Sequence, residues 1–129
     1  MANFTPGELD VMRILWEHGP LKPGEIQERF PRPIKDPALR SYLTILVEKG
    51  HVVRRRAGKA YAYRARTPRE QAFRTMVHRL VDAFCEGSAR KLLAHLVREE
   101  KLSPEDLRDL ERIAKGGEAA GNPGKGGYR

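Results

Sequence analysis

The chain has 129 residues, 33% of them charged, and Lys plus Arg outnumber Asp plus Glu by 25 to 17, which gives a net charge of +8. This length accommodates a compact module with a helical extension but not a large enzyme, and the basic excess favours a polyanionic partner. No apolar run approaches the ~20 residues of a membrane helix, no signal pattern opens the sequence and one cysteine allows no internal disulfide, so we expect a cytoplasmic protein with no membrane partner.

Five prolines that stand just inside helix-periodic segments mark helix starts, because proline fits only the first turn of a helix. They are Pro6, Pro23, Pro37, Pro68 and Pro104. The first helix is predicted from about Pro6 to His18, with a capping box formed by Thr5 and Glu8. A short second helix follows Pro23, buries Ile26 and Phe30, and ends at Pro31. The first helix is expected to bury Leu9, Met12, Leu15 and Trp16.

A third helix is predicted from Pro37 to Lys49, with Asp36 as a capped start and Gly50 as its stop. Its inward stripe consists of Leu39, Leu43, Leu46 and Val47. The remaining face is a candidate surface for reading DNA, on which Arg40 has the geometry to fork onto a guanine or clamp a phosphate. The alternative is an ordinary solvated helix face. The candidate contacts are Lys35, Ala38, Arg40, Ser41 and Thr44.

After Gly50 the period changes from that of a helix to that of a strand, and two short strands that meet at Ala57-Gly58 predict a hairpin. Residues 51–66 carry six basic side chains and no acidic one. Arg54 and Arg56 share a strand face and Lys59 lies beside the turn, so these three are candidate phosphate or minor-groove contacts. Tyr61 and Tyr63 are expected to pack on the helices, with a phosphate-binding hydroxyl as the alternative.

Three helices followed by a basic hairpin is the order of a winged helix, in which the third helix enters the major groove. We therefore expect a mainly α fold with a small β-hairpin: an N-terminal winged helix-turn-helix over residues 1–66 and a C-terminal helical dimerisation region over 67–115. Residues 116–129 are glycine-rich and are predicted to form a disordered tail.

The C-terminal region is predicted to hold three helices, two of which start at capping boxes opened by Thr67 and Ser103. Their apolar stripes are too short to form an independent core, so pairing with a second copy would bury them and make a homodimer. The first stripe is also compatible with the lining of a ligand pocket, as in drug-sensing regulators. The candidate dimerisation residues are Phe73, Met76, Val77, Leu80, Val81, Phe84, Leu92, Leu93 and Leu96.

Several segments together resemble the penicillinase and methicillin-resistance repressors and their copper-responsive relatives, the BlaI/MecI/CopY family. The resemblance covers roughly residues 4–115. It implies homodimers that bind pseudo-palindromic operators through the N-terminal domain, with interlocking C-terminal helices. The segments that carry it are 9–16 (LDVMRILW), 46–50 (LVEKG), 58–63 (GKAYAY), Gly87-Ser88 and Leu102-Ser103.

Two departures from the family pattern affect the expected inducing signal. Antibiotic-responsive members are switched by cleavage of an Asn-Phe bond in the fifth helix, but the matching positions here are His95 and Leu96. The copper-responsive branch ends in paired Cys-x-Cys motifs, and this chain has only Cys85. Neither trigger carries over, and the sequence does not identify an inducing protease or ligand.

The sequence holds no catalytic constellation and no paired metal-ligand spacing, so we expect a protein that is not an enzyme and has no metal or cofactor. The favoured function is a homodimeric, sequence-specific repressor on a palindromic double-stranded DNA operator. The alternatives are a winged-helix adaptor that binds protein and a ligand-sensing regulator.

Overall fold

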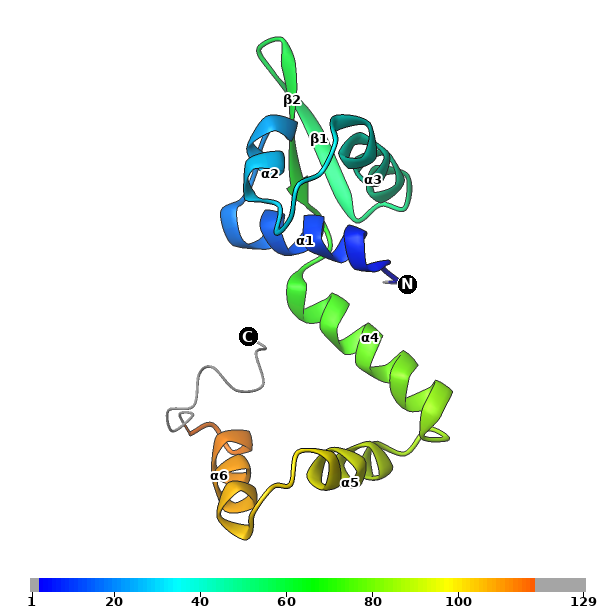
Figure 1. Cartoon of the computed structure of the whole chain (residues 1–129), viewed down its shortest axis with the longest axis vertical. Helices are drawn as coiled ribbons and strands as arrows, with labels where there is room; N and C mark the ends of the chain where they lie inside the picture. Colours follow the sequence, from blue (N-terminus) through cyan, green and yellow to red (C-terminus); the bar gives the residue numbers. More distant parts are fainter. Residues whose placement is uncertain (1–2, 118–129) are drawn as a thin grey trace. The chain divides into compact units, whose positions relative to one another are not determined.

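The computed structural model describes residues 3–117, which fold into six helices and one two-stranded antiparallel hairpin (Figure 1). The mainly helical class with a small hairpin is therefore confirmed. Contacts divide the chain into two units, one that extends to Leu80 and one that begins at Val81. The elements are α1 (Pro6–His18), α2 (Pro23–Arg29), α3 (Asp36–Glu48), β1 (Val52–Ala57), β2 (Ala60–Ala65), α4 (Arg69–Phe84), α5 (Ala89–Glu99) and α6 (Pro104–Ala114).

The core of the first unit forms where α1, α2 and α3 pack on the hairpin. The α1 helix has the predicted bounds and capping box, but Val11 and Ile14 are buried where Leu9 and Trp16 were expected. Leu9 and Trp16 are partly buried at the edge of the core. The reason is that α1 contacts α2, α3 and β2, so its buried face is wider than a single stripe.

The α3 helix buries Leu39, Leu43 and Leu46 as predicted, whereas Val47 is only half-buried. It begins one residue early, with Lys35 at the N-cap and no side-chain cap. The predicted cap by Asp36 is therefore wrong. The Asp36 carboxylate instead accepts a hydrogen bond from Arg40.

The hairpin pairs Val52 with Ala65 and Ala57 with Ala60, which leaves Gly58 and Lys59 as a two-residue turn. The turn lies one residue later than predicted. Gly58 has a φ of 67°, as fits a two-residue turn that needs positive φ at its first central residue. Leu21 adds a bridge beside β2 through two backbone hydrogen bonds with Tyr63. In Figure 1 the hairpin tip extends beyond the ends of α2 and α3.

The second unit lacks a comparable core. Ser103 and Asp106 form the predicted capping box at the start of α6, and Ser88 caps α5. Yet neither α5 nor α6 buries a residue, although both are strongly amphipathic. Of the predicted tail over 116–129, only Gly116 and Gly117 belong to the described part, and the rest lies outside it.

The α4 helix begins at Arg69. The Thr67 hydroxyl, predicted to cap this helix, instead lies 2.7 Å from His51 Nδ1. The N-terminal part of α4 belongs to the first unit, since Ala72 is 1% exposed in its core and Met76 packs against that core.

Candidate nucleic-acid interface

The five candidate contacts on and before α3 are all exposed. At 100° per residue, Ser41 lies almost opposite the buried leucines. Thr44 and Arg40 flank Ser41 on one side and Ala38 on the other. A polar face made mostly of short side chains thus backs onto a tightly packed apolar face, which is the geometry needed to approach base edges in a groove.

Arg40 is held by an acid one turn earlier on the same helix. Its Nε donates to Asp36 Oδ2 at 2.8 Å, and the two side chains are 60% and 54% exposed. An exposed i,i+4 pair contributes only about 0.3–0.5 kcal/mol, so it can be exchanged for a stronger contact with DNA. The pair turns the guanidinium toward Asp36 at the start of α3.

On the hairpin, the register places Arg54 and Arg56 on one face together with Tyr61 and Tyr63. The shared face predicted for the two arginines is confirmed. Their guanidinium carbons lie 4.4 Å and 5.6 Å from the centre of the Tyr61 ring. These cation–π contacts hold both cations near the ring while their polar groups remain exposed. Lys59 is exposed in the turn.

The two tyrosines have different environments. Tyr63 is 7% exposed and belongs to the core, so its predicted packing is confirmed. Tyr61 is partly buried and packs against that core while its ring carries the arginines. Both aromatic side chains therefore pack the hairpin against the core of the first unit.

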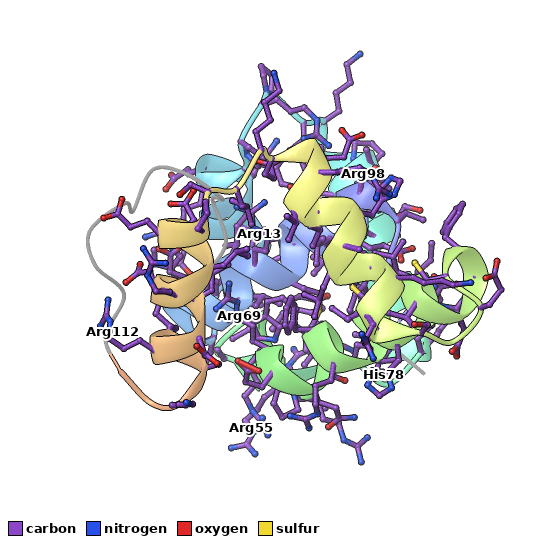
Figure 2. The ribbon with its side chains drawn as sticks, turned by 90° about the horizontal axis from the view of Figure 1, so that it is seen from below. Arg13, Arg55, Arg69, His78, Arg98 and Arg112 are labelled. Atoms are coloured by element: carbon purple, nitrogen blue, oxygen red, sulfur yellow. The ribbon has the colours of Figure 1, made fainter. Side chains whose placement is uncertain are left out.

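Sequence reasoning did not select the cations on the opposite face of the hairpin. Arg55 and Arg64 lie there, since they alternate with the residues of the Tyr61 face. Figure 2 shows Arg55 extending away from the ribbon. The face borders a shallow hollow of about 360 Å³ that is also lined by Pro20, Val53 and Ala62. The alternation of side chains along a strand, which puts Arg55 on the side opposite Arg54 and Arg56, could have predicted this second basic face from the sequence.

The candidate dimerisation residues differ in exposure within a single chain. Val81 is buried and Met76 packs against the core of the first unit, to which it belongs, whereas Phe84 is 77% exposed. Leu80, Leu93 and Leu96 are also exposed. Every exposed large hydrophobic side chain among residues 3–117 lies in α4, α5 or α6: Phe73, Leu80, Phe84, Leu93, Leu96, Leu107 and Leu110.

Nothing in the described part of the chain forms a metal centre, since no three His, Cys, Asp or Glu side chains gather there. His78 is exposed on α4 and Cys85 is buried after its end. No helix over residues 3–117 has the length and apolar character needed to cross a membrane.

A family model described as penicillinase repressor matches residues 4–116 of this chain. An uncharacterized 16.5 kDa protein encoded in the ptsI 3' region of Latilactobacillus sakei is 26% identical over 113 residues, which cover 86% of this chain and 77% of that relative.

Solved structures show a similar fold. The oxidized form of MarR from E. coli is 21% identical with a TM-score of 0.50, and the alignment covers 88% of this chain and 74% of that one. YusO from Bacillus subtilis is 22% identical with a TM-score of 0.51, and the alignment covers 86% of this chain and 72% of that one. MarR from Staphylococcus aureus, in complex with salicylate and kanamycin, is 17% identical with a TM-score of 0.51. That alignment covers 88% of this chain and 70% of the other. At such identities the likeness concerns the winged-helix fold alone.

Proposed function

Because this chain belongs to the penicillinase repressor family of winged-helix transcriptional regulators, which are not enzymes, we propose that it is a homodimeric repressor that binds a palindromic DNA operator. The resemblance carried by the sequence motifs is confirmed by the family match. The family binds DNA operators, typically as dimers. For this chain we propose a palindromic operator and the residues that contact it.

The observation that carries the proposal is the pairing of two surfaces on one unit. The exposed polar face of α3 follows a fully buried leucine stripe, and a hairpin with six basic side chains and no acid over 51–66 extends beside it. In the proposed complex α3 enters the major groove. Arg40 leaves Asp36 to contact a guanine, while Ser41, Thr44 and Ala38 approach neighbouring base edges or a thymine methyl.

The hairpin supplies affinity more than sequence choice. Arg54 and Arg56, supported by Tyr61, contact phosphates or the minor groove, and Lys59 at the turn adds a third cation. Each phosphate that these side chains neutralise releases counterions, so operator affinity falls steeply with salt.

The homodimer forms through the helical region proposed for residues 67–115. Without a partner, α5 and α6 bury no side chain, and Leu93, Leu96, Leu107 and Leu110 are exposed to water. A second copy covers these faces isologously, since a two-fold dimer uses the same patch on both subunits. The two α3 helices then reach successive major grooves about one DNA turn apart, and the bound dimer blocks access to the promoter.

The test is a selection of genomic DNA fragments by the full chain, followed by binding titrations across salt concentrations. Recovery of one shared inverted repeat, bound by a dimer with a steep salt dependence, supports the repressor. Weak binding without sequence preference overturns it and favours the protein-binding adaptor. A single-stranded RNA that competes as well as duplex DNA also overturns it.

A further inference from the structure

Three polar side chains from distant parts of the sequence meet where the hairpin returns to the helices. The Thr67 hydroxyl lies 2.7 Å from His51 Nδ1, and the Trp16 indole Nε1 donates to the Thr67 carbonyl at 2.8 Å. The amides of Arg66 and Thr67 both donate to the His51 carbonyl, at 2.8 Å and 3.3 Å. The segment between β2 and α4 is thereby bonded to α1 and to the start of β1.

This cluster also reaches α3, because the His51 amide donates to the Leu46 carbonyl at 3.0 Å. It is shielded from water: His51 is 7% and Thr67 9% exposed, and the Phe4 ring contacts the His51 ring edge-on at 4.7 Å. Two residues further on, α4 begins, and its Ala72 is buried in the same unit. Buried, fully paired polar groups hold one arrangement, because each broken bond leaves an unsatisfied group.

We propose that Trp16, His51 and Thr67 form a joint that fixes the direction of α4 relative to α3 and so sets the half-site spacing that the dimer accepts. The inference rests on the proposed function, because it assumes an operator with two half-sites. These three are positioning residues, since His51 and Thr67 are buried, Trp16 is partly buried, and all three act through the two helices that they connect.

The joint matters because a change in the number of base pairs between the two half-sites alters both their separation and their relative rotation about the DNA axis. One added base pair moves a half-site by about 3.4 Å and rotates it by about 34°. With a stiff joint, that mismatch must be met by distorting protein or DNA, so affinity falls. With a loose joint, the two α3 helices follow the displaced half-site at lower cost.

The test compares Thr67→Val with Thr67→Ser on operators whose half-sites are moved by one base pair in either direction. Valine keeps the shape and the backbone carbonyl but removes the hydroxyl, whereas serine retains the hydroxyl. We expect Thr67→Val and Trp16→Phe to reduce the discrimination against altered spacing by roughly three- to tenfold, while Thr67→Ser keeps the wild-type discrimination. Ile26→Val serves as a control for general loss of stability.

A second measurement needs no DNA. In a Cys85→Ser background, spin labels at Glu48→Cys on α3 and His78→Cys on α4 report the distance between the two helices in labelled chains diluted with unlabelled ones. We expect a narrow distance distribution with Thr67 or Ser at position 67 and a broader one with Val. An unchanged distribution in Thr67→Val, an unchanged spacing penalty, or equal behaviour of the Val and Ser variants overturns the joint. Failure to recover any operator overturns the proposed function instead, and the label distances still decide on the joint.

Discussion

Arg40, the DNA contact that we propose on α3, is already held by a neighbouring acid in the free chain. In the unbound protein its Nε is occupied by Asp36, so the cation lies along the helix in one orientation. The pair costs little to break because both groups are exposed. In the proposed complex, a weak contact is therefore replaced by a forked contact to a base edge, which is worth more in a groove from which water is excluded.

Replacing Arg40 by alanine is expected to weaken operator binding by about 1–3 kcal/mol and to relax specificity at one base pair. The dimer should persist, because Arg40 lies on α3 and far in sequence from the apolar helices. Binding titrations against the operator and single-base variants measure both effects. Arg40→Lys is the matched control, since it keeps the charge but loses the fork. Unchanged affinity in Arg40→Ala would remove this residue from the interface.

Gly7 and Gly24 occupy equivalent positions in the first turns of α1 and α2 but face different surroundings. A Cβ on Gly7 would overlap the Cζ and Oη atoms of Tyr42, whereas one on Gly24 meets nothing within 4 Å. Gly7→Ala is expected to lower the free energy of unfolding by about 1–3 kcal/mol through overpacking. Gly24→Ala should instead raise it by about 0.4–1 kcal/mol. Urea denaturation separates the two, and equal effects would contradict the close approach of Tyr42.

Much of the candidate site could be predicted because it depends on local periodicity. The buried stripe of α3 determines its outer face, and strand alternation places Arg54 beside Arg56. The uses of Asp36 and Thr67 could not be predicted in this way. Both have the sequence signature of a helix cap, but Asp36 pairs with Arg40, and Thr67 meets a histidine that is 16 residues away in sequence and adjacent only in the fold.

At the scale of elements, prolines and glycines located the helices to within a residue or two, since each excludes the helical interior for a steric reason. Burial was less predictable. The α1 helix is contacted by three elements, so Val11 and Ile14 are covered although they lie beside the expected stripe. Periodicity gives the direction of a face, whereas its width depends on how many neighbours pack against it.

The hairpin is expected to control the salt dependence of DNA binding. Replacing Arg54, Arg56 and Lys59 by glutamine should reduce the slope of log affinity against log salt by about 0.9 for each phosphate that the variant no longer neutralises. The preference for the operator over other sequences should remain, because the α3 face is intact. Titrations at several salt concentrations on both DNAs measure the two quantities. The triple substitution of Arg79, Arg90 and Arg98 by glutamine, on α4 and α5, is the control that removes the same amount of charge.

The buried contact of His51, just before β1, with Thr67, in the segment before α4, predicts a pH dependence of stability. Burial and the charge of Lys49 lower the pKa of His51 below 6.5, although Glu8 opposes them. Below pH 6.5 the unfolded chain therefore binds a proton that the folded chain resists, so stability is retained above that pH and falls below it, by at most about 1.4 kcal/mol per pH unit. Urea denaturation between pH 7.5 and 5.5 should show this fall. The control His18→Gln should show the same fall in stability, whereas His51→Gln should show a smaller one. An undiminished fall in His51→Gln would mean that another group causes the pH dependence.

At the scale of the whole molecule, the two units differ in how much of their stability each can supply alone. The first has a core of fully buried side chains such as Met12, Ile26 and Leu39. In the second, α5 and α6 bury nothing within one chain. In the proposed homodimer, partner contacts supply the apolar burial that holds α5 and α6, so we expect thermal stability to rise with protein concentration.

Changing Leu80 to aspartate is expected to yield monomers with weak operator binding, because a charge on the exposed apolar face of α4 would be buried unpaired in the dimer. Sedimentation measures the oligomeric state and titration the affinity. Gln71→Asp is the matched control, since it adds the same charge on the opposite side of α4. Dimers that survive in Leu80→Asp would reject this face as the seam.

The absence of buried residues in α5 and α6 has a consequence for gene dosage. If only the paired chain holds an operator, then at low copy number the amount of active repressor scales with the square of the number of chains, so doubling the chains gives about four times the dimer. Dilution of the chains as the cell grows would then lower the amount of dimer by the same square law. A cell that inherits fewer copies would express the controlled genes sooner than a linear response allows.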